Sequence, residues 1–163
     1  MAVDLAQIIP PLVRAKVDFI LIGGMAAILH GSARVTFDVD LVYSRAHENI
    51  ERLAAGLAPH GPHLPDASPG LPFAWDAKTI SSGLNFTLTT KLGDVDLFGE
   101  VASGDTYEDL LAHSFDVDAF GVRFKCINLP TLIRIKEAAG RPKDREAIAE
   151  LRVLLEESEK KQA

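Results

Sequence analysis

Two short segments of the sequence alternate aspartate with apolar residues, Asp38-Val39-Asp40-Leu41 and Asp94-Val95-Asp96-Leu97. Since successive side chains of a strand point to opposite faces, each segment would place two carboxylates on one face, roughly 6–7 Å apart. Aspartate is depleted in strands, and neighbouring carboxylates repel each other unless a cation lies between them. A hard divalent ion such as Mg²⁺ suits oxygen ligands of this kind. The alternative for each segment is a strand with a solvated acidic face.

The repetition of the acidic pattern favours the metal interpretation. If the two strands are neighbours in one sheet, three or four carboxylates converge at one place. Such a cluster is able to hold two metal ions and to leave one carboxylate as a base. We therefore expect the strand that carries Asp38 and Asp40 to lie beside the strand that carries Asp96, with these three side chains converging.

A double glycine, Gly23-Gly24, separates an apolar run at residues 17–22 from a short segment rich in Ala, Ile and Leu at residues 25–30. This order predicts a strand, a tight turn and a helix. Small residues let a ligand approach closely, and a helix N-terminus offers free N–H groups to phosphate. A double glycine also occurs in many turns without a ligand. It gains weight here because a metal–nucleotide complex requires a phosphate site beside a metal site.

The glycines and the first acidic segment together resemble the signature of nucleotidyltransferases of the DNA polymerase β superfamily. Gly23-Gly24 is followed, after 13 residues, by Asp38-Val39-Asp40-Leu41, and Asp96 resembles the third carboxylate that these enzymes carry on a later strand. Residues 23–40, with Arg34-Val35-Thr36, and residues 136–144 are similar to a narrower group, the AbiEii-like abortive-infection nucleotidyltransferase toxins and their uncharacterised relatives. The resemblance covers about residues 4–155.

The resemblance implies the roles of five residues. Asp38 and Asp40 would bind Mg²⁺ or Mn²⁺, Asp96 would be a ligand and the general base, and Gly23 and Gly24 would face the triphosphate of an NTP. The implied activity is transfer of NMP from an NTP to a hydroxyl of RNA, protein or a small molecule. The protein would be the toxin-like part of a toxin–antitoxin system with an antitoxin-like partner. The alternative is a catalytically idle nucleotide- or partner-binding module on the same fold.

Three further charged residues leave alternatives open. Asp94 shares a strand face with Asp96 and is the second choice as a ligand, because the family pattern favours Asp96. Arg34 would contact phosphate or pair with Asp38 for structure. Lys136 would contact phosphate or substrate, or it would be a solvated helix residue.

Composition and charge exclude several classes of protein. The 163 residues are 47% hydrophobic and 25% charged, which is ordinary for a soluble globular protein and argues against intrinsic disorder. The formal net charge of −6 argues against a general nucleic-acid coat. The longest apolar run, residues 19–29, is too short to cross a bilayer. We therefore expect a single cytoplasmic domain over residues 1–163, with no membrane partner.

Hydrophobic periodicity predicts the elements that position these residues. The predicted helices cover about residues 4–16, 25–30, 46–57, 105–113, 130–139 and 143–156. The predicted strands cover about residues 17–22, 37–42, 84–90, 94–98, 115–120 and 122–127. This order predicts an α+β domain, a nucleotidyltransferase-like mixed sheet flanked by helices, with a C-terminal helical portion at about residues 128–158.

Local signals refine these elements. Pro10 and Pro11 are expected to kink or restart the first helix. Asp105 and Glu108 resemble a capping box at the start of a helix. Residues 59–72 are rich in proline and glycine and predict a surface loop, and the charged residues 157–163 are expected to fray.

Overall fold

The computed structural model describes residues 4–65 and 73–162. These residues form one six-stranded sheet, β1 (Phe19–Ile22), β2 (Asp38–Tyr43), β3 (Asn85–Thr90), β4 (Gly93–Phe98), β5 (Ser114–Ala119) and β6 (Val122–Ile127). They also form the helices α1 (Leu5–Arg14), α2 (Gly23–Leu29), α3 (His47–Leu57), α4 (Ala77–Ser82), α5 (Tyr107–Leu110), α6 (Leu129–Ala139) and α7 (Asp144–Gln162), with short 3-10 helices at Ala58–His60 and Leu111–His113. The predicted α+β class is confirmed.

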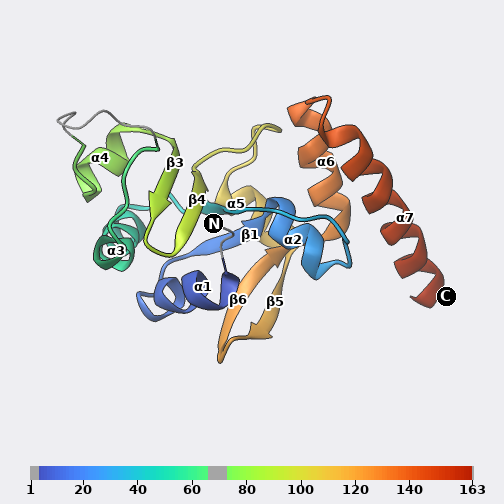
Figure 1. Cartoon of the computed structure of the whole chain (residues 1–163), viewed down its shortest axis with the longest axis horizontal. Helices are drawn as coiled ribbons and strands as arrows, with labels where there is room; N and C mark the ends of the chain where they lie inside the picture. The colour runs from blue at the N-terminus through green and yellow to red at the C-terminus, as the bar shows by residue number, and fades with distance from the viewer. Residues whose placement is uncertain (1–3, 66–72, 163) are drawn as a thin grey trace.

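The sheet is mixed, with the strand order β3-β4-β2-β1-β6-β5. The pairs β3/β4 and β5/β6 are antiparallel hairpins, and β1 is antiparallel to β2. The pairs β2/β4 and β1/β6 are parallel. The central position of β2 places both acidic strands next to each other, although 49 residues, 44–92, lie between them in the sequence. Figure 1 shows this sheet, with the β5/β6 hairpin extending away from the rest.

Strand alternation separates the core from the acidic face of the sheet. Val39 and Leu41 of β2 and Val95 and Leu97 of β4 are at most 1% exposed. They belong to the same hydrophobic cluster as the buried apolar residues of α1 and α3. The aspartates between them point the other way. One face of these strands therefore packs in the hydrophobic core, and the opposite face presents the aspartates to a ligand.

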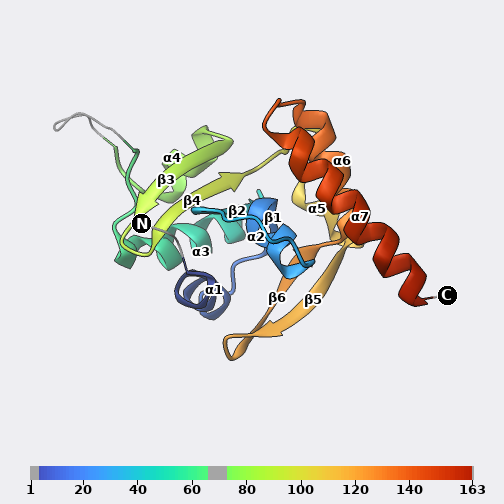
Figure 2. The same cartoon turned by 45° about the vertical axis from the view of Figure 1, so that its right-hand side comes forward.

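The helices α6 and α7 pack against each other at one end of the molecule, next to α2 (Figure 2). Asn128 caps α6, accepting a hydrogen bond from the Thr131 backbone N–H at 3.0 Å, and Gly140 ends it in the left-handed conformation, with φ +63°. A sharp junction follows, and α7 begins at Asp144. This junction brings the basic segment at residues 136–143 toward the acidic face of the sheet. Among the described residues, no helix has both the length and the apolar character needed to cross a bilayer.

The structure corrects several predicted boundaries. The prolines do not restart α1, because the carbonyls that lose a donor belong to exposed residues, Ala6 and Gln7, which water can reach. Thr106, paired with Asp109, forms the capping box of α5 in place of Asp105 and Glu108.

Other differences lie in the loop and at the end of the chain. The tail predicted to fray, residues 157–163, is helical as far as Gln162, with Lys160 and Lys161 in the last turn of α7, and residue 163 lies outside the described residues. Within the predicted loop, His63 pairs with Thr89 of β3, and residues 66–72 lie outside the described residues.

Candidate metal and nucleotide site

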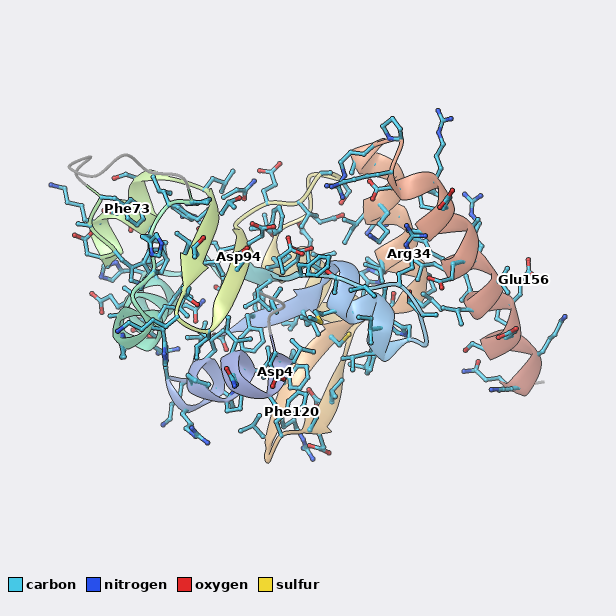
Figure 3. All side chains as sticks on the ribbon, in the orientation of Figure 1. Asp4, Arg34, Phe73, Asp94, Phe120 and Glu156 are labelled. Carbon is cyan, nitrogen blue, oxygen red and sulfur yellow. The ribbon has the colours of Figure 1, made fainter. Side chains whose placement is uncertain are left out.

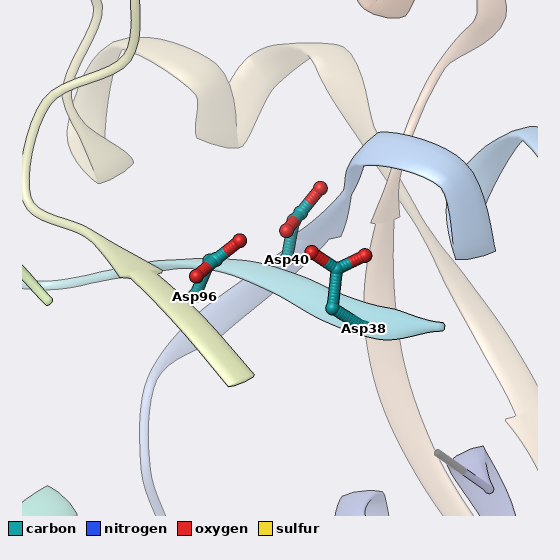
Figure 4. A group of neighbouring side chains, drawn as sticks. All are labelled: Asp38, Asp40 and Asp96. Carbon is teal, nitrogen blue, oxygen red and sulfur yellow. The ribbon is translucent and has the colours of Figure 1, made fainter. Parts of the chain in front are cut away.

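The three aspartates predicted to converge lie together on one face of the sheet. The parallel register of β2 and β4 sets Asp40 directly opposite Asp96, and Asp38 precedes Asp40 by two residues on the same face. One carboxylate oxygen from each of the three lies within 4.8 Å of the others. Figure 4 shows the three side chains rising from the two strands toward the same point. We call these residues the acidic triad.

Asp94 is not part of the acidic triad. It pairs with Asp38 in the strand register, as Asp96 pairs with Asp40, but its side chain is exposed. The cluster found among the described carboxylates contains Asp96 and leaves Asp94 out. The number of converging carboxylates is therefore three, and Asp94 offers a control residue of the same type on the same face.

Asp40 lies deepest in the acidic triad. Its Oδ1 is buried and finds no hydrogen-bond partner among the described residues. Burial, followed by the nearby carboxylates of Asp38 and Asp96, raises the pKa of Asp40 to about 8, while the Lys136 ammonium acts in the opposite direction. Burial also raises the pKa of Asp96.

A buried oxygen without a donor, beside two more carboxylates, fits a hard divalent cation. The ion would satisfy that oxygen and offset the repulsion among the three side chains. The donor set, oxygen only, suits Mg²⁺ or Mn²⁺ and excludes a thiolate-type site. Thr36 supports this arrangement, since its hydroxyl donates to Oδ1 of Asp38 at 3.2 Å.

The metal-free protein is expected to lose thermal stability as the pH rises from about 5 to about 8. In this range the folded state still holds the Asp40 proton, because its pKa is raised from 3.8 to about 8, whereas the unfolded state has released it. The free energy of unfolding therefore falls with pH. Asp40→Asn should flatten this slope, because asparagine has no proton to lose. Thermal midpoints of both proteins in chelator measure the difference, and parallel pH profiles would contradict the raised pKa.

The glycine turn at the start of α2 packs directly against the acidic triad. Gly23 has φ +70°, and a Cβ atom at this position would lie 2.0 Å from Oδ2 of Asp40. A Cβ atom on Gly24 would lie 2.8 Å from the hydroxyl of Thr36. The two glycines thus leave the space that Asp40 and Thr36 occupy. The sequence pattern indicated small residues here for a ligand, and the structure shows that neighbouring side chains also require them.

A cavity of about 290 Å³ lies against the acidic triad. All three aspartates line it, together with Gly24 and Thr36. Its remaining walls carry four basic residues and two further carboxylates: Arg34, Lys136, Arg141, Lys143, Asp144 and Glu150. We call this space the polar cavity. The acidic triad suits a metal ion, and the basic side chains, which outnumber the carboxylates among them, suit a polyphosphate bound to that ion.

The two basic residues singled out in the sequence have different surroundings. Arg34, labelled in Figure 3 beside the C-terminal helices, has Nη1 at 3.7 Å from Oε2 of Glu146. This is the ion pair that Arg34 makes among the described residues, so the alternative pairing with Asp38 is wrong. Lys136 has a side chain only 14% exposed, with Nζ at 4.0 Å from Oδ1 of Asp144. It is therefore not a solvated helix residue.

Asp144 is a site residue that the sequence pattern did not single out. It is 4% exposed and accepts hydrogen bonds from Nε and Nη2 of Arg141 at 2.7 and 3.2 Å. The same carboxylate lies near the Lys136 ammonium. One buried anion thus orients two cations along the wall of the polar cavity. The signal was present in the charged segment at residues 136–144, but spacing alone did not show which charges face one another.

The helix α7 also holds the loop that carries Arg34. The Ser32 hydroxyl donates to Oε1 of Glu150 at 2.5 Å, and the Ala33 backbone N–H donates to Oε2 of the same residue at 3.2 Å. These bonds lower the pKa of Glu150. The Arg34 backbone N–H donates to the Ser32 hydroxyl at 3.1 Å. The rim of the polar cavity is therefore built from two distant parts of the chain.

Comparison with known proteins supports the fold. No model of a protein family matches this sequence, and no curated protein matches it. Among solved structures, the chain is similar to a Thermotoga maritima protein provisionally named a nucleotidyltransferase, with a TM-score of 0.56 and 18% identity over 94% of this chain and 91% of that one. At this level of identity, the likeness establishes the fold alone. The fold is nucleotidyltransferase-like, and the narrower AbiEii-like assignment stays a prediction from the sequence.

Proposed function

We propose that the protein is a metal-dependent nucleotidyltransferase that moves NMP from an NTP to a hydroxyl acceptor. The observation that supports this most strongly is the convergence of Asp38, Asp40 and Asp96 at the wall of a cavity that also carries four basic side chains. Phosphoryl transfer requires positioning and charge neutralisation more than covalent help from the protein. A cavity with an acidic wall for a cation and a basic wall for polyphosphate meets that requirement.

The acidic and basic walls would have complementary roles. Bound Mg²⁺ or Mn²⁺ would neutralise phosphate charge and polarise the reacting phosphoryl group. Asp38 and Asp40 would hold the ion, and Asp96 would hold it and accept the proton of the attacking hydroxyl. The hydroxyl oxygen forms a bond to the α-phosphorus while the bond from that phosphorus to the pyrophosphate oxygen breaks. Lys136 and Arg141 would stabilise the charge on the departing pyrophosphate.

The finer assignments rest on the sequence resemblance. They are an acceptor hydroxyl on RNA, protein or a small molecule, a toxin-like role with an antitoxin-like partner, and a cytoplasmic location. Gly24 and Arg34 would contact the triphosphate in the polar cavity, and Gly23, which packs against Asp40, would face it. The alternative function, an idle nucleotide-binding module, has less support because such a module has no use for three converging carboxylates.

Transfer of label from NTP tests the proposed activity. The protein is incubated with Mg²⁺ and each α-labelled NTP, with tRNA pools or cell lysate as the acceptor. Label should move to an acceptor with the wild-type protein and with Asp94→Asn, the matched control outside the acidic triad, but not with Asp96→Asn. Metal-dependent NTP binding without transfer to any acceptor would favour the idle module.

Removal of divalent metal is expected to weaken NTP binding at least about fivefold, because close carboxylates repel the triphosphate by roughly 1 kcal/mol or more per pair. Calorimetric titrations with Mg²⁺ and with chelator measure the change. In chelator, Asp38→Asn should bind NTP more tightly than the wild type, since it removes one repelling charge. The same NTP affinity with and without metal would argue against a metal–triphosphate site.

A further inference from the structure

A second cavity, of about 270 Å³, adjoins the polar cavity. Its wall is mostly aliphatic, with contributions from Ile22 at the end of β1, Val101 after β4, and Leu132, Ile135 and Ala139 of α6. We call this space the apolar cavity. Leu132 is fully buried and Ile135 is 8% exposed, so the wall is part of the packed core of the protein.

The two cavities meet at four residues. Asp40, Phe98, Lys136 and Arg141 line both of them. A ligand that extends through this junction would place an anionic group beside Lys136 and Arg141 and an apolar group against α6. An NTP combines these two properties, because its polyphosphate is strongly anionic and its base presents apolar faces.

The distribution of the acidic triad indicates which reactant enters each cavity. Asp96, the proposed base, lines the polar cavity but not the apolar cavity. The attacking hydroxyl must come within hydrogen-bond reach of that base, so it enters through the polar cavity. The apolar cavity is then left for the nucleoside group that remains attached to the α-phosphorus.

We infer that the apolar cavity holds the nucleobase of the NTP and selects it by size. The inference rests on the proposed function. The polar side chains in its wall are Asp40, Lys136 and Arg141, all at the junction with the polar cavity. Its aliphatic part, formed by β1 and α6, offers no side-chain donor or acceptor to the edge of a base. Burial therefore decides affinity, so purines bind more tightly than pyrimidines, and adenine and guanine are bound similarly.

Calorimetry with Mg²⁺ present tests the inference on the wild-type protein, with ATP, GTP, CTP, UTP and inorganic tripolyphosphate as probes. Tripolyphosphate measures the polar cavity alone, and the gain on going to an NTP measures the base. We expect the purine NTPs to bind at least about tenfold more tightly than tripolyphosphate. Equal affinities for all five probes would overturn the inference and leave the triphosphate site intact.

A variant that fills the apolar cavity locates the base. Ala139→Phe places a ring in this space, and Ala138→Phe is the matched control, because Ala138 is its exposed neighbour on the same helix and does not line the cavity. The first should bring the Kd of ATP to that of tripolyphosphate, with tripolyphosphate binding unchanged within twofold. The second should bind both as the wild type does.

The outcomes separate the inference from the function on which it rests. If Ala139→Phe still binds ATP more tightly than tripolyphosphate, to the same extent as the wild type, the base lies elsewhere. That result would overturn the inference but leave the proposed function intact. If neither ATP nor tripolyphosphate binds to the wild-type protein with Mg²⁺, the proposed function fails and the inference fails with it. The comparison among bases needs no variant, so equal affinities for all five probes would overturn the inference even if Ala139→Phe does not fold.

Discussion

Asp40→Asn is expected to reduce nucleotidyl transfer by orders of magnitude while it stabilises the metal-free protein. Asparagine keeps the size of the side chain but removes one charge from the site that would hold the metal. The same charge is buried, lacks a hydrogen-bond partner for Oδ1 among the described residues and is repelled by Asp38 and Asp96. At pH 8 in chelator, its removal should raise the free energy of unfolding by about 1 kcal/mol or more.

Thermal unfolding and NMP transfer measured on one preparation separate a metal ligand from a structural residue. Asp94→Asn is the control, because it removes the same charge from an exposed position on the same face of the sheet. It should change stability by less than about 0.5 kcal/mol and leave transfer intact. Full transfer by a normally folded Asp40→Asn protein would leave nucleotide binding without catalysis as the better explanation of the fold.

Gly23→Ala is expected to abolish transfer and to cost more stability than backbone strain alone explains. Gly23 has φ +70°, a region that costs an alanine about 1 kcal/mol. The added Cβ would also lie 2.0 Å from Oδ2 of Asp40, so the carboxylate must move. Because the proposed metal site depends on the position of that carboxylate, metal binding and transfer should both be lost.

Gly121→Ala is the matched control for the strain. Gly121 has φ +75°, and a Cβ atom there would meet nothing within 4 Å. This variant should lose about 1 kcal/mol of stability and keep full transfer. Chemical denaturation gives the stability of both variants, and calorimetric Mg²⁺ titration gives metal binding. Equal losses in the two variants, with transfer retained in both, would show that Gly23 does not position Asp40.

Neighbouring residues in the sequence fix the positions of some charged residues of the site, whereas tertiary packing fixes the positions of others. The faces of Asp38 and Asp40 follow from strand alternation, which depends only on neighbouring residues. Strand alternation does not decide between Asp94 and Asp96 as the third carboxylate, because both have the same local pattern. Asp96 is opposite Asp40, which packs against the glycine turn and feels the charge of Lys136, whereas Asp94 is exposed. Only the folded chain creates that difference.

In the basic wall of the polar cavity, too, local sequence patterns predict some features and miss the contacts between distant residues. The bounds of α6, Leu129–Ala139, agree closely with the predicted range of residues 130–139, because helix ends are set by local hydrogen bonds. The contact of Asp144 with Lys136 requires α7 to fold back on α6, whereas its ion pair with Arg141, three residues earlier, is local. The hydrogen bonds from Ser32 and Ala33 to Glu150 join residues more than 100 positions apart. No local pattern predicts such pairings.

The sequence by itself determined the α+β class, most strands and helices, and the shared strand face of Asp38 and Asp40. These features follow from periodicity, turn residues and alternation, all of which act over a few residues. The tertiary structure alone decided the order of the strands, the burial that raises the pKa of Asp40, the exclusion of Asp94, and the apolar cavity beside the acidic triad. Burial and cavity shape depend on which distant segments pack together, and that packing is a property of the whole chain.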